Sequence, residues 1–141
     1  MSEVIYTTNL EGIDWAEMKS TLSRDNFDNG RTPEQLKVSF YNSYAACIAC
    51  YAGKIIGTAR VLSDGVCNAY LVDVWTLTEF RRRGIASAMI QKIMSLLSGQ
   101  HIYLQTDDAL EFYAKLGFVE QPFGMGKVIG KWLINTGNES A

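Results

Sequence analysis

The sequence predicts a mixed α/β (α+β) fold in which a sheet of six or seven strands, antiparallel in its N-terminal part, is combined with four helices. Three β-rich runs follow one another between residues 44 and 76 and are separated by short turns, as in an antiparallel meander. After residue 84 a helix, a strand and another helix alternate, which indicates one parallel crossover. A length of 141 residues is typical of a single domain, and residues 1–141 are expected to form one.

The part of the chain ahead of the meander contains one predicted strand and two predicted helices. Val4–Thr8 is β-rich and predicts the strand. The first helix begins near Ile13, and its apolar face consists of Trp15, Met18 and Leu22. Thr32-Pro33-Glu34-Gln35 is a helix start, because Thr32 can cap the helix, Pro33 suits the first helical position and Gln35 completes a capping box. The second helix is therefore expected to run to about Asn42.

The meander itself consists of three predicted strands. They are Tyr44–Tyr51, Lys54–Leu62 and Asn68–Thr76. Ala52-Gly53 and Ser63-Asp64-Gly65 contain the residues that favour tight turns between them. Consecutive strands joined by such short turns pair antiparallel.

The C-terminal part of the chain alternates helices and strands. Its long helix carries apolar residues at three- and four-residue spacing, at Ile85, Met89, Ile93 and Leu96 or Leu97. A strand over Ile102–Thr106 and a helix over Ala109–Leu116 are expected next. Phe118–Pro122 and Val128–Ile134 predict two closing strands, and residues 135–141 are expected to form a flexible tail.

Composition and charge exclude several classes of protein. The formal net charge of −2, from 13 basic and 15 acidic residues, opposes a duplex-binding protein, so no nucleic-acid partner is expected. The N-terminal residues lack a basic segment followed by an apolar run, and the longest apolar stretch is too short to span a bilayer. A cytoplasmic location without a membrane partner is therefore expected. Three cysteines, Cys47, Cys50 and Cys67, are expected to be reduced, and no metal site is expected.

A basic turn links the last meander strand to the long helix. Val74-Trp75-Thr76 ends the strand, Arg81-Arg82-Arg83-Gly84 forms the turn, and Ile85 opens the helix. N–H groups in the first turn of a helix lack intrahelical partners, and the helix dipole is positive there, so a phosphate is favoured. Arginine donors match phosphate oxygens two at a time, and glycine permits close approach of the backbone. The turn predicts a site for a pyrophosphate, with a solvated basic turn as the alternative.

Two motifs stand on either side of the strand that follows the long helix. They are Arg81-Arg82-Arg83-Gly84-Ile85-Ala86 and Ala109-Leu110-Glu111-Phe112-Tyr113-Ala114-Lys115-Leu116-Gly117-Phe118. With the order of elements, they resemble the GNAT family of acetyl-CoA-dependent N-acetyltransferases, whose motifs are Q/R-x-x-G-x-G/A and A-x-x-F-Y-x-x-L-G-F. Either motif alone is weak, but both in this order are specific. Ala59-Arg60 and Val72-Asp73-Val74 resemble the branch that includes plant and cyanobacterial serotonin N-acetyltransferases.

The sequence also departs from the family pattern. Thr78 stands in place of the usual proline, and Arg82 stands in place of a common glycine. Asp107-Asp108 stands where many members carry an asparagine that contacts the cofactor. These differences affect the fine shape of the loop and that one contact, but they leave the positive charge of the turn unchanged.

The resemblance implies acetyl-CoA as cosubstrate and transfer of its acetyl group to a primary amine of a small molecule, such as an arylalkylamine or a polyamine. It implies direct attack in a ternary complex, with the backbone near Thr76 polarising the thioester carbonyl. Tyr113 is implied as the general acid that protonates the leaving thiolate, with a core aromatic residue as the alternative. The implied cofactor-binding residues are Val74, Trp75, Thr76, Arg81, Arg82, Arg83, Gly84, Ile85, Ala86 and Ser87.

The acceptor side of the site is less specified. Asp73, on the strand that carries the cofactor, is the first choice for the base that deprotonates the amine, and a structural carboxylate is the alternative. Phe27, Tyr41 and Trp75 are candidates for apolar walls of the acceptor pocket, or else core residues. Two alternative functions stay open. One is a non-catalytic acetyl-CoA-binding or protein-interaction module, and the other is an acetyltransferase of protein N-termini or lysines. Self-association as a homodimer also stays open.

Overall fold

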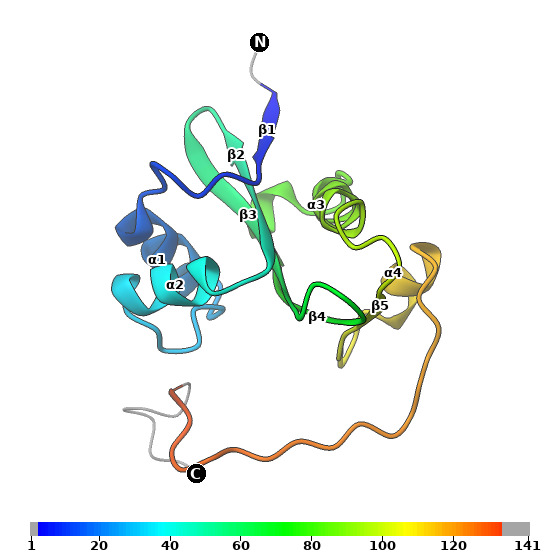
Figure 1. Cartoon of the computed structure of the whole chain (residues 1–141). Coiled ribbons are helices and arrows are strands. Elements are labelled where there is room, and N and C mark those ends of the chain that lie inside the picture. Colours follow the sequence, from blue (N-terminus) through cyan, green and yellow to red (C-terminus); the bar gives the residue numbers. More distant parts are fainter. Residues whose placement is uncertain (1–2, 134–141) are drawn as a thin grey trace.

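The computed structural model describes residues 3–133, in which one five-stranded mixed sheet lies between helices (Figure 1). The strands are β1 (Val4–Thr7), β2 (Ala45–Tyr51), β3 (Lys54–Ser63), β4 (Asn68–Thr76) and β5 (His101–Tyr103). They lie in the order β1-β2-β3-β4-β5. The first four pair antiparallel and β5 pairs parallel to β4, which confirms the predicted meander and crossover.

Four α-helices pack around this sheet, as the periodicity predicts. They are α1 (Trp15–Arg24), α2 (Pro33–Tyr41), α3 (Ile85–Met94) and α4 (Leu110–Lys115), and a short 3-10 helix, η1 (Thr78–Phe80), precedes α3. The pair α1 and α2 lies on one side of the sheet and α3 on the other (Figure 1). No helix of the described residues is both long enough and apolar enough to cross a membrane.

Local sequence signals account for where the helices begin. At the start of α2, Thr32 Oγ1 accepts a hydrogen bond from Gln35 N at 3.1 Å, and Gln35 Oε1 accepts one from Thr32 N at 3.0 Å. This is the predicted capping box, which satisfies two amides that a helix start leaves unpaired. At α1, Asp14 Oδ1 accepts from Glu17 N at 3.0 Å.

The core lies on both faces of the sheet, between it and the helices. Its fully buried large side chains are Met18, Leu22, Leu36, Phe40, Ile48, Ile56, Val61, Met89, Ile90 and Ile93. Cys47 belongs to the same core, and burial, partly offset by the charge of Lys92, raises the pKa of its thiol to about 11. Cys50 is half-buried and Cys67 is exposed, and all three cysteines are free. The described residues contain no group of three or more His, Cys, Asp or Glu side chains that could hold a metal.

The predicted number of strands is wrong. Residues 3–133 contain five strands instead of six or seven, because residues 118–133 form neither of the two closing strands. In addition, β5 is shorter than predicted. Pro122 cannot donate to a ladder, and Gly124, Gly126 and Gly130 weaken a strand. This segment instead runs in an extended path away from α4 (Figure 1). The predicted tail, residues 135–141, and Ile134 lie outside the described residues.

Candidate functional site

The strands β4 and β5 diverge after a short stretch of pairing. Asn68, Ala69 and Tyr70 pair with His101, Ile102 and Tyr103, and β4 then continues to Thr76 without this partner. The edge of β4 beyond Tyr70 therefore presents backbone N–H and C=O groups that β5 does not occupy. Such an edge can pair with an extended ligand by the same hydrogen bonds that pair two strands.

The turn after β4 has the backbone conformation of an anion site. Arg82 has φ +67° and Gly84 has φ +79°, so left-handed residues occur next to the start of α3. Conformations of this kind turn successive N–H groups toward one point. Gly84 is the N-cap of α3 and provides no side-chain cap, and a Cβ placed on it would meet nothing within 4 Å. The first amides of α3 therefore have no side-chain cap, and the helix dipole favours an anion at this end of the helix.

The three arginines of the turn have different surroundings. Arg81 Nε donates to Thr76 O at 2.8 Å, and its Nη2 donates to Asp25 Oδ2 at 3.2 Å. The guanidinium of Arg83 lies over the Phe80 ring, 5.2 Å from its centroid. Arg82 and Arg83 are exposed. The side chain of Arg81 thus connects the turn to the strand end, and the other two cations are available to a ligand.

Asp25 holds the turn to the end of α1. Its carboxylate accepts from Trp75 Nε1 at 3.0 Å and from Thr78 Oγ1 at 3.1 Å, in addition to Arg81. The Trp75 ring is buried, so this indole supports the strand from within the core. Sequence reasoning missed Asp25, because an acidic residue at the end of a helix carries no signal of a partner fifty residues away.

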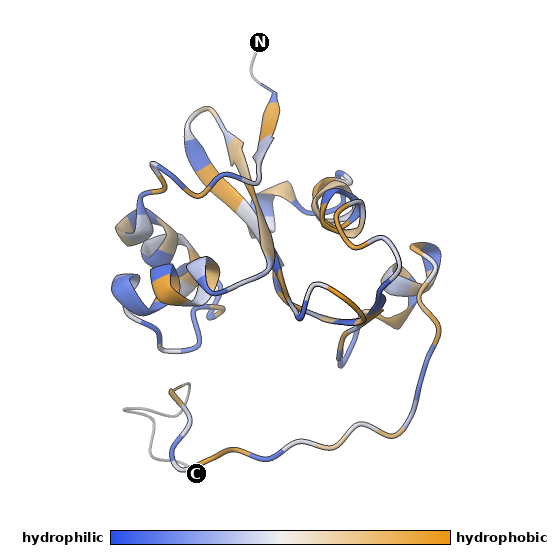
Figure 2. Ribbon diagram, in the orientation of Figure 1, coloured by the Kyte–Doolittle hydropathy of each residue, from blue (hydrophilic) through white to orange (hydrophobic). Residues whose placement is uncertain are grey.

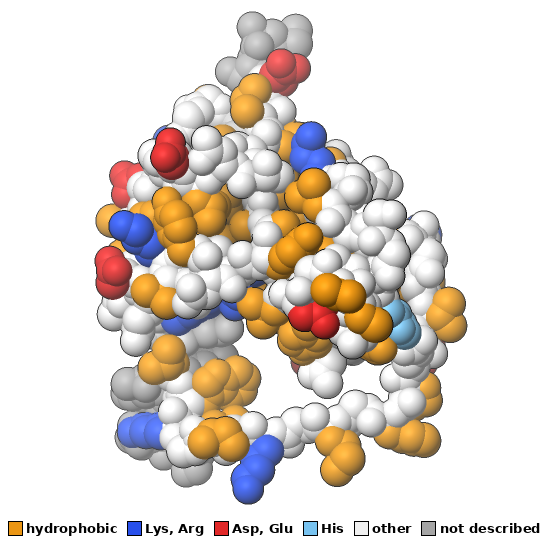
Figure 3. Space-filling view, viewed as in Figure 1, with side chains coloured by type: hydrophobic (Ala, Val, Ile, Leu, Met, Phe, Trp, Pro, Cys, Tyr) orange, Lys and Arg blue, Asp and Glu red, His pale blue; other side chains and the backbone are white. Residues whose placement is uncertain are grey.

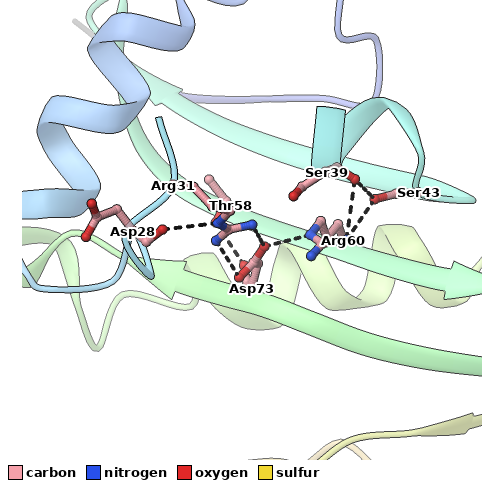
Figure 4. Close-up of polar contacts among 7 residues, drawn as sticks. All are labelled: Asp28, Arg31, Ser39, Ser43, Thr58, Arg60 and Asp73. Atoms are coloured by element: carbon pink, nitrogen blue, oxygen red, sulfur yellow. Dashed lines mark hydrogen bonds and ion pairs between the residues drawn. The ribbon is translucent and has the colours of Figure 1, made fainter. Parts of the chain in front are cut away.

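Asp73 lies where the register between β3 and β4 shifts, and it is the centre of a buried ion-pair network (Figure 4). Arg31 donates to both of its oxygens, at 2.9 and 3.1 Å, and Arg60 Nε donates to Oδ2 at 2.6 Å. Burial raises the pKa of Asp73, but the hydrogen bonds and charges of the two arginines outweigh this and hold it below its ordinary value. A carboxylate in this environment is a poor proton acceptor. The geometry therefore favours the structural alternative for Asp73 over a base.

Thr76 ends β4 with an unpartnered polar atom. Its side chain faces α3, because it pairs with Gly57, whose missing Cβ would lie 3.0 Å from Met89 Cε. The residue is 9% exposed, and among the described residues its Oγ1 has no hydrogen-bond partner. Leaving a buried hydroxyl unsatisfied costs about 1–3 kcal/mol. This hydroxyl lies at the end of β4 that β5 leaves unpaired.

Tyr113 lies on α4, beside a broad groove of about 1330 Å³ that is bordered by β5, α4 and residues 118–124. Its ring packs edge-on against Phe112 at 4.9 Å and Phe118 at 5.6 Å between centroids. Burial raises the pKa of its phenol above the ordinary value. The phenol therefore keeps its proton at neutral pH, as a proton donor must.

The predicted acceptor residues lie on α2 and on the loop between α1 and α2. Phe27 is half-buried and packs against the core. Tyr41 is half exposed; its ring lies 6.1 Å from that of Trp15, and its hydroxyl donates to Leu10 O at 3.4 Å. These contacts place Tyr41 with the segment before α1 and do not bring it to β4. Phe27 and Tyr41 stay predictions as acceptor walls.

Known proteins resemble this chain in sequence and in fold. Residues 11–118 match the Acetyltransferase (GNAT) family. An N-acetyltransferase of Pyropia yezoensis, ycf52, which is described as uncharacterized, is 33% identical over 76 residues, which make up 51% of this chain and 44% of that protein. The chloroplastic GCN5-related N-acetyltransferase 2 of Arabidopsis thaliana is 32% identical over 76 residues, 51% of this chain and 30% of that protein. The match thus spans less than half the length of either relative.

Solved structures share the fold of this chain. A protein of Xanthomonas campestris pv. campestris assigned to the GNAT acetyltransferases superposes with a TM-score of 0.77 at 25% identity, covering 90% of this chain and 94% of the other. A protein of Deinococcus radiodurans assigned as an acetyltransferase gives a TM-score of 0.78 at 24% identity, covering 88% and 87%. At 24% identity, the similarity to the Deinococcus radiodurans protein shows a shared fold alone.

Proposed function

The chain belongs to the Acetyltransferase (GNAT) family. We propose that it is an acyltransferase that transfers the acetyl group of acetyl-CoA to the primary amine of a small molecule, by direct attack in a ternary complex. One observation carries the proposal: the open edge of β4 is followed, after η1, by the left-handed turn at the start of α3. A ligand that joins a pantetheine arm to a pyrophosphate has the two parts that this path accommodates.

The turn would hold the pyrophosphate mainly through its backbone. The amides of Ile85, Ala86 and Ser87 begin α3, where no side chain caps the helix. The exposed cations of Arg82 and Arg83 add positive charge at this point. Arg81 contributes by fixing the turn to Thr76 and Asp25, not by its own free charge.

The strand end would provide the electrostatic part of catalysis. Backbone N–H groups along Val74, Trp75 and Thr76 are fixed dipoles, and a donor at the thioester oxygen stabilises the charge that develops there during acyl transfer. The buried and unpaired Thr76 hydroxyl lies at the same end of the strand. Fixed donors act without the reorganisation that water would need.

Tyr113 would protonate the leaving thiolate. A thiol has an ordinary pKa of about 8.5, and a phenol whose pKa lies above about 10 is still protonated when the thiolate departs. The acceptor amine, with an ordinary pKa of about 10, must lose a proton before it attacks. Because two arginines bind the Asp73 carboxylate, we propose that water, and not Asp73, accepts the proton of the amine.

A thiol-release assay with acetyl-CoA over a panel of amines tests the proposed function. The panel contains serotonin, tryptamine, polyamines, peptides with free N-termini and peptides with lysine. Turnover confined to small amines supports the proposal, and turnover of the peptides alone assigns a protein acetyltransferase instead. Acetyl-CoA binding without turnover of any amine would identify a non-catalytic binding module.

The variant Tyr113→Phe tests the assigned acid. It removes the phenolic proton and keeps the ring that packs against Phe112 and Phe118. Loss of a general acid lowers kcat by roughly a hundredfold or more. Acetyl-CoA affinity should not change, and Phe112→Leu, which alters the neighbouring ring, serves as the control. An unchanged kcat in Tyr113→Phe assigns this tyrosine to the core.

A further inference from the structure

The loop between α1 and α2, residues 25–32, holds the strand β4 at two points. Near its start, Asp25 accepts a hydrogen bond from Trp75 Nε1 at 3.0 Å. Near its end, Arg31 donates to both carboxylate oxygens of Asp73, at 2.9 and 3.1 Å (Figure 4). The two contacts lie on either side of residue 74, in the part of β4 that β5 leaves unpaired.

Asp25 also binds the chain beyond the end of β4. Its Oδ1 accepts from Thr78 Oγ1 at 3.1 Å, and its Oδ2 accepts from Arg81 Nη2 at 3.2 Å. Arg81 in turn donates through Nε to Thr76 O at 2.8 Å. A carboxylate can accept all these donors at once, because its two oxygens have about four lone-pair sites. One side chain thus fixes the end of β4, η1 and the start of the basic turn relative to one another.

Polar contacts inside the α1–α2 loop fix its own shape. Arg31 donates through both N and Nε to Asp28 O, each at 3.1 Å. Lys19 of α1 pairs with the Asp28 carboxylate. Most of the loop is hydrophilic, and Phe27 is its one apolar side chain (Figure 2). The position of the loop against β4 therefore depends largely on polar contacts, of which those of Asp25 lie nearest the basic turn.

Asp25 differs from the other charged side chains of this region in its burial. Charges of both signs lie on the outer surface of the helix pair α1 and α2, where solvent screens them (Figure 3). Arg24 and Glu79 form one such pair at 3.0 Å, and both side chains are more than half exposed. The side chain of Asp25 is only 14% exposed. Hydrogen bonds to a charged group in such surroundings are stronger than in water, so Asp25 constrains the chain after β4 more than the exposed pair does.

The contact between Asp25 and Thr78 also accounts for a departure from the family pattern. Thr78 stands where the family usually has a proline. A proline ring fixes the backbone locally but has no hydroxyl to donate. Thr78 is exposed, and its hydroxyl donates to a residue 53 positions earlier in the chain. In this chain a distant carboxylate therefore restricts the position that a ring restricts in relatives.

We propose that Asp25 is a positioning residue for acetyl transfer. It acts through Trp75, Thr78 and Arg81, and it holds the strand end assigned to the thioester in register with the turn assigned to the pyrophosphate. Both assignments belong to the proposed function, so this inference rests on it. A misplacement of about 1 Å can lower a rate by roughly a hundredfold. The same loop carries Phe27, a predicted acceptor wall, so Asp25 also fixes the acceptor side relative to the cosubstrate.

The variant Asp25→Asn tests this role, with Asp14→Asn as its matched control. Asparagine keeps the shape of the side chain, but its NH2 group cannot accept a hydrogen bond, and it carries no charge for Arg81. With an amine that the wild type acetylates, kcat should fall roughly tenfold or more. Asp14 caps the other end of α1 through Glu17 N, and asparagine caps a helix equally well, so kcat of Asp14→Asn should not change. Wild-type kcat in Asp25→Asn overturns the proposal.

A pair of variants at Thr78 keeps the test decisive if Asp25→Asn does not fold. Thr78 is exposed, so neither Thr78→Val nor Thr78→Ser disturbs the core. Valine has the shape of threonine without its hydroxyl, whereas serine keeps the hydroxyl. We expect Thr78→Val to lower kcat roughly threefold to tenfold, as for one hydrogen bond to a charged group, and Thr78→Ser to retain most of that activity. Equal kcat values in the two variants overturn the proposal.

Acetyl-CoA binding and the indole signal of Trp75 give a test that needs no turnover. In a 15N–1H correlation spectrum, Trp75→Phe identifies this signal, and Asp25→Asn should shift it while the signal of Trp15, at the start of α1, stays in place. Calorimetry should find acetyl-CoA affinity lowered roughly tenfold in Asp25→Asn and unchanged in Asp14→Asn. An unchanged affinity in Asp25→Asn would show that Asp25 does not hold the turn, and it would overturn the proposal. If the wild type acetylates no amine, the proposed function fails, whereas a lowered affinity still shows that Asp25 positions the cosubstrate.

Discussion

Asp73 determines the local shape of β4 through one unusual backbone conformation. Its φ of +55° is rare for a residue other than glycine, and it lies where the register between β3 and β4 shifts. Such a conformation persists only where the surroundings fix it. Here Thr58 Oγ1 donates to the Asp73 carbonyl at 2.8 Å, while Arg31 and Arg60 bind its carboxylate. We infer that the network holds the bulge beside the open edge.

Asp73→Asn should destabilise the protein in a pH-dependent way. Removing the charge leaves two buried guanidinium groups without a counter-ion, so the free energy of unfolding at pH 7 should fall by about 3 kcal/mol. The folded pKa of Asp73 lies below its ordinary value, so its contribution is present above the unfolded pKa and is lost as pH falls through the folded pKa. The difference between the variant and the wild type should therefore shrink below about pH 4.

Urea unfolding at a series of pH values measures this difference. Glu79→Gln is the matched control, because Glu79 pairs with Arg24 and both side chains are more than half exposed. An exposed pair contributes about 0–1 kcal/mol, so the control should change stability little. A cost of Asp73→Asn that stays constant from neutral to acidic pH would contradict the assignment.

At the scale of elements, the sequence predicted what is local and missed what depends on a distant partner. The capping box of α2 and the glycine turn before α3 are encoded by adjacent residues, so their chemistry could be read directly. The outcome for the two predicted closing strands could not be read from adjacent residues, because a strand forms only where a partner edge and a suitable path exist together. The arginine partners of Asp73 come from a loop and from β3, and no spacing connects them.

Gly84→Ala tests whether the turn before α3 acts through its backbone. Gly84 and Gly99 have nearly equal positive φ values, +79° and +82°, and a Cβ on either would meet nothing within 4 Å. Alanine at either position should therefore cost similar stability, about 1 kcal/mol. Only Gly84 adjoins the proposed pyrophosphate site, so calorimetry should find acetyl-CoA affinity reduced roughly tenfold in Gly84→Ala and unchanged in Gly99→Ala. Equal affinities in both variants would place the anion elsewhere.

At the scale of the whole molecule, three stretches of strand edge have no partner strand among the described residues. β1 has one free edge at the N-terminal side, β4 has a free edge beyond Tyr70, and β5 has an outer free edge. We assign the second to the cosubstrate. The family and the mixed sheet followed from the sequence, because motifs and periodicity are properties of one chain. The function of each edge could not be predicted from the sequence, because it depends on what binds there.

Amide hydrogen exchange can show which edge of the sheet the cosubstrate occupies. Added acetyl-CoA should slow exchange in peptides that cover residues 71–76 and 82–88, because pairing along β4 and an anion at the start of α3 both engage amides. Peptides from β1 (Val4–Thr7) report an edge that no proposed ligand touches and should not change. Protection of β1 on adding acetyl-CoA, without protection of residues 71–76, would contradict this assignment, because it would place the cosubstrate at another edge of the sheet.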